Sequence, residues 1–297
     1  MDQTVVENEL VFVECPRDAM QGIKEFIPTE VKINYLKYLL TVGFDVLDCG
    51  SFVNPESIPQ MADTAEVLHG ISDISSNTKL LVIIANERGA LRAASFRSIS
   101  YLGYPFSISE TFQRRNTNAS REEAYRRLAK IQDIAAASKK EVIAYISMAF
   151  GNPYGDSYQI DDIVEWGQKI AALGIRTISL ADTVGSATPE EISTIFSEVN
   201  HKLPHLTIGL HLHAKSMDWE HKIKAAFDSG CRRFDGALAG FGGCPMAKDE
   251  LVGNIPTEDV LPWLNNAIGN TTNANREKLS KAKEIAMLCY QGIPYNY

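Results

Sequence analysis

Two histidines spaced two residues apart, His211 and His213, are the residues of this sequence best suited to chemistry. They end the apolar, β-favouring run 206–213, which predicts a strand buried on both faces. Residues i and i+2 of a strand point to the same side, so we expect the imidazoles to lie close enough to bind one metal. The alternative is a pair of polar residues that caps a strand, and an H-x-H pair alone does not decide between the two.

The segments that must position this pair alternate short apolar runs with longer amphipathic runs. The runs predict strands over 10–15, 44–49, 80–85, 105–108, 142–148, 175–180, 206–213 and 232–237. They predict helices over 29–41, 59–68, a segment ending at 97, a segment starting near 120, 160–172, a segment starting at 189, 219–228, 257–268 and 275–290. Ser120 and Glu123 form the capping-box pattern of a helix start.

Eight strand-then-helix units without a Pro- or Gly-rich linker predict a (β/α)8 TIM barrel. We expect one catalytic domain over residues 1–297, with a helical extension over about 272–297. The alternative is an open doubly wound sheet, which would need a reversal of strand order.

Bulk properties narrow the class of protein. The chain has 297 residues, 45% of them hydrophobic, and a net charge of -8, which argues against nucleic acid or an anionic membrane as partner. The first residues lack the cationic and apolar regions of a signal peptide, and the five cysteines have no paired spacing. We therefore expect reduced thiols and a cytoplasmic location.

In a barrel of this kind, the chemistry lies at the C-terminal ends of the strands. The polar residues near those ends are Arg17, Asp18, Asp48, Asp182, His211, His213 and Asn254. Two imidazoles with the oxygens of Asp18 and Asn254 suit Mg²⁺ or Mn²⁺, and two histidines with one carboxylate also suit Zn²⁺.

Cys244 follows the glycine-rich stretch 239–243, which predicts a mobile loop with an exposed thiol. Near a metal and an arginine its pKa should fall, which would suit a proton donor or acceptor. The alternative is a tight turn with an incidental cysteine.

Several motifs resemble those of 3-hydroxy-3-methylglutaryl-CoA lyase, within the metal-dependent barrel lyases and Claisen-type synthases. The resemblance covers nearly the whole chain. It rests on CPRD at 15–18, SFV at 51–53, PQMAD at 59–63, SETF at 109–112, NPY at 152–154, SLADTVG at 179–185, HLH at 211–213, AGFGGCP at 239–245, GN at 253–254 and TED at 257–259. The glycine-flanked Cys244 favours the lyase branch, because the related synthases lack it.

The resemblance implies a (β/α)8 fold and a divalent metal held by Asp18, His211, His213 and Asn254. It implies an acyl-CoA substrate, cleaved to acetyl-CoA and acetoacetate, and often a homodimer. It also implies that Arg17 stabilises an enolate and that Cys244 joins the site when its loop closes.

In such a retro-Claisen cleavage, metal binding lowers the pKa of the substrate hydroxyl, so that a modest base can remove its proton. Asp48, Asp182 or a metal-site histidine such as His211 is the expected base. Cys244 is the expected proton donor to the enolate carbon, or a relay for one.

Some positions depart from the family pattern. Asp48 stands where glutamate is usual, Ala214 where an acidic residue follows the second histidine, and Asn152 in place of a cysteine. Gly22 and Ile23 replace an Asn-Glu pair. These departures leave open a lyase or aldolase for another 3-hydroxyacyl thioester or hydroxy diacid. The sequence also leaves open a Claisen condensing acyltransferase and a catalytically silent barrel that serves in binding.

Overall fold

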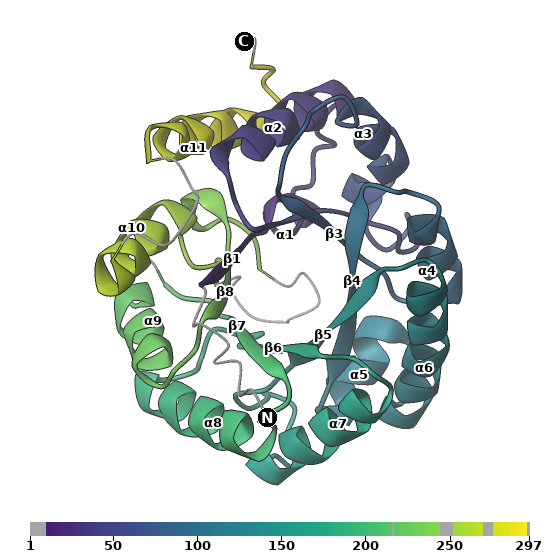
Figure 1. Cartoon of the computed structure of the whole chain (residues 1–297), viewed down its shortest axis with the longest axis vertical. Helices are drawn as coiled ribbons and strands as arrows, with labels where there is room; N and C mark the ends of the chain where they lie inside the picture. The colour runs from purple at the N-terminus through teal and green to yellow at the C-terminus, as the bar shows by residue number, and fades with distance from the viewer. Residues whose placement is uncertain (1–9, 216, 244–251, 270–275, 296–297) are drawn as a thin grey trace, which may run out of the picture.

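The structure is a computed structural model that describes residues 10–215, 217–243, 252–269 and 276–295. Eight parallel strands close into a barrel in the order β1 to β8, with β8 paired to β1 (Figure 1). The strands are β1 (Val11–Glu14), β2 (Val46–Ser51), β3 (Lys79–Ile83), β4 (Ile99–Ser107), β5 (Glu141–Ser147), β6 (Thr177–Ala181), β7 (Thr207–His211) and β8 (Arg233–Gly236). The predicted (β/α)8 fold is therefore confirmed, and the doubly wound alternative is wrong because the sheet has no open edge.

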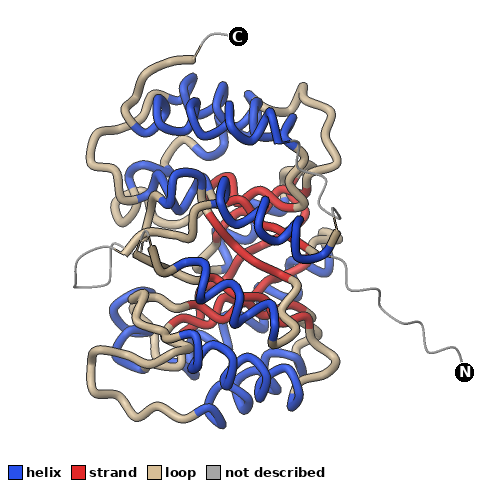
Figure 2. The backbone as a smooth tube through the Cα atoms, turned by 90° about the vertical axis from the view of Figure 1, so that its left-hand side faces the viewer, coloured by secondary structure: helices blue, strands red, loops and turns tan. Residues whose placement is uncertain are grey.

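The helices form a ring outside the strands, which occupy the middle of the molecule in the view turned by 90° (Figure 2). The α-helices are α1 (Pro16–Gln21), α2 (Thr29–Val42), α3 (Thr64–Gly70), α4 (Glu87–Ala94), α5 (Glu110–Thr117), α6 (Arg121–Ala137), α7 (Ile160–Ala172), α8 (Pro189–Lys202), α9 (Trp219–Asp228), α10 (Thr257–Ile268) and α11 (Arg276–Tyr290). Short 3-10 turns lie at η1 (Pro59–Met61) and η2 (Leu238–Gly240). Among the described residues, no helix has the length and apolar character that a membrane crossing requires.

The barrel has an inner and an outer core. Val13, Val46, Leu81 and Ile143 pack inside it, and a larger apolar layer separates the strands from the helices. At the end of the chain, α11 lies beside α2, where the hydroxyls of Tyr35 and Tyr290 are 3.2 Å apart (Figure 1). The helix expected at the C-terminus thus covers the outside of the barrel next to its first long helix.

Several predicted boundaries differ from the structure. Strand β4 begins at Ile99 rather than 105, and the expected helix over 59–68 is split into η1 and α3. Helices α1 and α5 have no counterpart among the predicted elements. Strand β7 ends at His211, so His213 lies beyond the strand, in an isolated bridge with Asn254.

Candidate metal centre and active site

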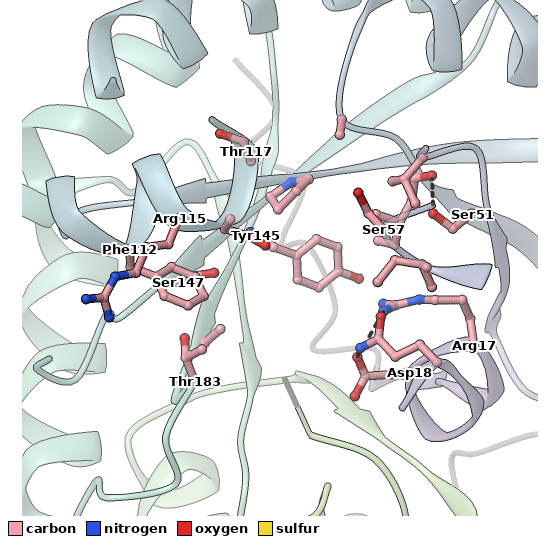
Figure 3. Close-up of a pocket in the computed structure, with 18 of the residues that line it drawn as sticks. Arg17, Asp18, Ser51, Ser57, Phe112, Arg115, Thr117, Tyr145, Ser147 and Thr183 are labelled. Carbon is pink, nitrogen blue, oxygen red and sulfur yellow. Dashed lines mark hydrogen bonds and ion pairs between the residues drawn. The ribbon is translucent and has the colours of Figure 1, made fainter. Parts of the chain in front are cut away.

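A cavity of about 470 Å³ lies at the C-terminal ends of the strands (Figure 3). Arg17 and Asp18 lie on one side of it, and the ring of Tyr145 points into it. His211 and His213 also line the wall. The cavity therefore combines side chains that could hold a metal ion with a fixed cation.

Helix α1 fixes Arg17 and Asp18 directly after β1. Pro16 occupies the first turn, where its missing N–H costs no hydrogen bond, and Ala19 N donates to Cys15 O. Arg17 Nη1 donates to Asp18 Oδ1 at 2.9 Å and to Gln21 Oε1 at 3.0 Å, one turn along the helix. One short helix thus presents a carboxylate and a guanidinium in a fixed relation.

Asp48 of β2 holds the other edge of the same guanidinium. Its Oδ2 accepts from Arg17 Nε at 3.0 Å and from Arg17 Nη2 at 2.5 Å. Burial raises the pKa of Asp48 to about 6, although the charge of Arg17 opposes the shift. Burial lowers the pKa of Arg17, but Asp48 and Asp18 outweigh it and raise that pKa, so the guanidinium is a permanent cation.

The two histidines are held by different partners. His211 Nδ1 lies 3.2 Å from Asp235 Oδ2, a carboxylate on the neighbouring strand β8. His213 Nδ1 lies 2.7 Å from the carbonyl oxygen of Asp182. In both rings Nδ1 is used, which leaves Nε2 for a ligand, and the ring centroids are 5.1 Å apart.

Protonation favours metal binding at Asp18 and His213. Burial raises the pKa of Asp18, but Arg17 and the two histidines outweigh it and hold that pKa well below its usual range. Burial and the neighbouring His211 lower the pKa of His213, which favours its neutral form. For His211, burial lowers the pKa but the hydrogen bond to Asp235 and the charge of Asp18 raise it, so a cation would have to compete with a proton.

Asn254 completes the set from beyond β8. Its Nδ2 donates to Asp18 Oδ2 at 2.7 Å and to Phe241 O at 2.9 Å. Its Oδ1 is buried and has no partner in the part of the chain that the structure describes. Gly242 makes this approach possible, because a Cβ there would lie 2.5 Å from Asn254 Nδ2.

These residues fit a divalent cation. Ligand atoms of Asp18, His211 and His213 lie within 4.8 Å of one another. Among the described residues, His213 Nε2 and Asn254 Oδ1 are both buried and have no hydrogen-bond partner, and unpaired buried polar atoms are costly unless a ligand satisfies them. The structure thus brings together the four side chains expected to bind metal.

The structure places the remaining predicted site residues in three different ways. Asp182 is 1% exposed, and its carboxylate accepts from Lys222 Nζ, Ser186 N and Ala187 N. Asp48 lies behind Arg17, so of the expected bases it is the metal-site histidines, His211 and His213, that line the cavity. Cys244 lies outside the described residues.

Three residues at this site were absent from the sequence prediction: Asp235, Lys222 and Tyr145. Asp235 faces the ring of His211, and Lys222 donates to the backbone carbonyl of His213. Tyr145 packs edge-on against His211, and its buried hydroxyl has no partner among the described residues. Alternation along β8 predicts that Asp235 points into the barrel, so that signal was present in the sequence. The position of Lys222 depends on the packing of α9 and had no local signal.

Comparison with known proteins places this site in context. The HMGL-like family model matches residues 11–285. The mitochondrial hydroxymethylglutaryl-CoA lyase of Mus musculus is 34% identical over 272 residues, which cover 91% of this chain and 82% of that protein. The cytoplasmic 3-hydroxy-3-methylglutaryl-CoA lyase of Rattus norvegicus is 33% identical, with 91% and 78% covered.

Solved structures of two lyases also resemble this chain over nearly its whole length. An HMG-CoA lyase from Acinetobacter baumannii, in complex with coenzyme A and 3-methylmalate, has a TM-score of 0.87 at 30% identity and covers 98% of this chain and 94% of its own. Hydroxymethylglutaryl-CoA lyase from Pseudomonas aeruginosa has a TM-score of 0.86 at 29% identity, with 96% and 94% covered. The carboxyl transferase domain of Rhizobium etli pyruvate carboxylase, at 15% identity and a TM-score of 0.71, shares the fold alone.

Proposed function

Because this chain belongs to the HMGL-like family and is a carbon–carbon lyase, we propose that it cleaves 3-hydroxy-3-methylglutaryl-CoA to acetyl-CoA and acetoacetate. The observation that carries the proposal is the convergence of Asp18, His211 and His213 on one cavity that also has Arg17 in its wall. Asn254 joins this set through its hydrogen bond to Asp18. The complex of the Acinetobacter baumannii enzyme, with coenzyme A and a small hydroxy diacid, supports a substrate of this class.

We assign a divalent cation, Mg²⁺ or Mn²⁺, to the four ligands, because half of their donor atoms are oxygens. When bound, it would lower the pKa of the substrate's tertiary hydroxyl and favour loss of its proton. The base stays a prediction among Asp48, Asp182 and a metal-site histidine. As a metal ligand, His211 has no free ring nitrogen to accept the proton, because its Nδ1 faces Asp235 and its Nε2 is assigned to the cation.

The bond changes then follow from the residues of the chain. As the hydroxyl loses its proton, its electron pair forms the ketone of acetoacetate and the adjacent C–C bond breaks. The released pair becomes the enolate of the acetyl thioester, and Arg17 is the residue that we expect to stabilise its oxygen. Asp48 and Asp18 hold the guanidinium for that role. A proton at the enolate carbon completes acetyl-CoA, and Cys244 stays the predicted donor.

The cellular location and the oligomeric state are also proposals. The relatives include mitochondrial and cytoplasmic lyases, so the cytoplasmic location stays a prediction. The same holds for the homodimer.

The test is a turnover assay on 3-hydroxy-3-methylglutaryl-CoA with Mg²⁺ or Mn²⁺, in which acetoacetate and acetyl-CoA are measured and EDTA is the control. We expect His213→Ala to lose both metal binding and turnover, and His205→Ala, an exposed histidine, to keep them. Metal binding without products would refute the acyl group proposed here, whereas absence of metal binding would refute the metal site.

A further inference from the structure

Lys222 of α9 is a buried lysine whose ammonium reaches the loops that follow β6 and β7. Its side chain is about 6% exposed. Nζ donates to Asp182 Oδ2 at 2.9 Å, to Gly185 O at 3.0 Å and to His213 O at 2.7 Å. An ammonium has three N–H donors, so all of them are engaged.

These acceptors hold His213 from two directions. The carbonyl oxygen of Asp182 fixes the ring through Nδ1, and Lys222 fixes the backbone of His213 itself. The Asp182 carboxylate is bound in turn by Lys222 and by the amides of Ser186 and Ala187. Lys222 therefore ties the orienting group of the imidazole to the backbone that carries the imidazole.

His213 needs such support because it lies outside the sheet. Strand β7 ends at His211, and within the described residues the sheet pairing of His213 is limited to an isolated bridge with Asn254, which is itself an expected ligand. His211 instead sits in the strand and has the Asp235 carboxylate behind it. The hydrogen bond from Lys222 on the outer helix α9 therefore supports the backbone of His213, whereas strand pairing supports the backbone of His211.

We propose that Lys222 is a positioning residue, which aims Nε2 of His213 at the metal position shared with Asp18 and His211. This inference rests on the proposed metal site. The residues that orient metal ligands typically change metal affinity by about 10–100-fold when they are mutated.

The test compares Lys222→Met with Lys32→Met, a matched control. Lys32 is also buried, donates to one carboxylate, Asp63 Oδ1 at 2.8 Å, and to one carbonyl, Gln60 O at 2.5 Å, but it contacts neither histidine. Mn²⁺ affinity is measured from the electron paramagnetic resonance signal of the free ion, and melting temperature is measured in EDTA. We expect Lys222→Met to raise the Mn²⁺ Kd by about 10–100-fold and Lys32→Met to change it less than twofold.

Loss of one partner from a buried ion pair can unfold a protein, so a second variant keeps the charge balanced. The double change Asp182→Asn with Lys222→Met removes both charges and leaves an amide oxygen for the two backbone donors. A folded single or double variant that binds Mn²⁺ as tightly as the wild type would overturn the inference, because a merely structural role would lower only the melting temperature. If the wild-type protein itself bound no Mn²⁺, the proposed metal site would fall, and this inference with it.

Discussion

Gly242→Ala tests whether the close approach of the loop after β8 sets the geometry of the proposed metal ligands. The added Cβ would lie 2.5 Å from Asn254 Nδ2, 2.9 Å from Asp18 O and 3.1 Å from Ala19 Cα. To reach ordinary contact at 3.4 Å, Asn254 would have to retreat by about 0.9 Å. That movement would stretch its 2.7 Å bond to Asp18 and shift Oδ1.

A displacement of about 1 Å at a catalytic site can reduce the rate by about 10²-fold. We therefore expect Gly242→Ala to reduce kcat/KM by about 10²-fold and to weaken Mn²⁺ binding by at least tenfold. Gly242 has a φ of +106°, so the variant also carries backbone strain of about 1–3 kcal/mol.

Gly230→Ala separates strain from displacement. Gly230 has a φ of +96°, but its added Cβ would meet nothing within 4 Å. We expect Gly230→Ala to lose stability in urea unfolding from the same kind of backbone strain, and to keep the Mn²⁺ affinity and kcat/KM of the wild type. Equal loss of metal affinity in both variants, or none in Gly242→Ala, would refute the reasoning.

Three further perturbations address the reaction and the fold. Arg17→Met should lower kcat by about 10²–10³-fold with little change in Mn²⁺ Kd, and a kcat near the wild-type value would rule out the enolate role. Tyr145→Phe should lower kcat/KM by about tenfold or more, because the hydroxyl of Tyr145 has no partner among the described residues and can bond the substrate. Tyr104→Phe is the control and should affect only stability, because the hydroxyl of Tyr104 donates to Ala124 O. Burial raises the pKa of Glu14 from 4.5 to about 8, so between these values the folded protein binds more protons than the unfolded chain. The unfolding free energy of the protein should then fall as pH rises, by up to about 1.4 kcal/mol per pH unit. Glu14→Gln should flatten that slope in urea titrations at pH 5, 6.5 and 8, and equal slopes in the two proteins would contradict the raised pKa of Glu14.

Helices with clear start signals could be predicted from the sequence. The capping box of Ser120 and Glu123 forms as expected, and α8 begins at Pro189 with its own capping box at Thr188. The helices α7, α9 and α10 match their predicted limits, because apolar and polar residues alternate with helical periodicity over ten residues or more.

Elements whose local signals conflict with their positions could not be predicted. Strand β4 contains Gly103 and Pro105, two residues that weaken a strand assignment, yet it pairs with β5 over seven residues. Helix α1 has six residues and buries Arg17 and Asp18, so its polar side faces the site rather than solvent. The requirements of the site override the usual hydrophobic pattern there.

The candidate ligands were visible in the sequence, but their supports were not. Spacing and strand ends pointed to His211 and His213, whereas the partners that orient them come from other elements. Asp235 is 24 residues from His211, and Asp182 is 31 residues from His213. Contacts over such distances follow from barrel closure and helix packing, which no local pattern records.

The pairing of β8 with β1 has a consequence for how the molecule is assembled. The hydrogen bond between Asp18 and Asn254 joins residues 236 apart in the chain, across the seam where the cylinder closes. A cation held by both residues would cross-link the first and last parts of the barrel. The proposed metal site would therefore be complete only after nearly all of the chain is in place. Removal of the cation by a chelator should loosen the pairing of β1 with β8 before it affects strands β3 to β6.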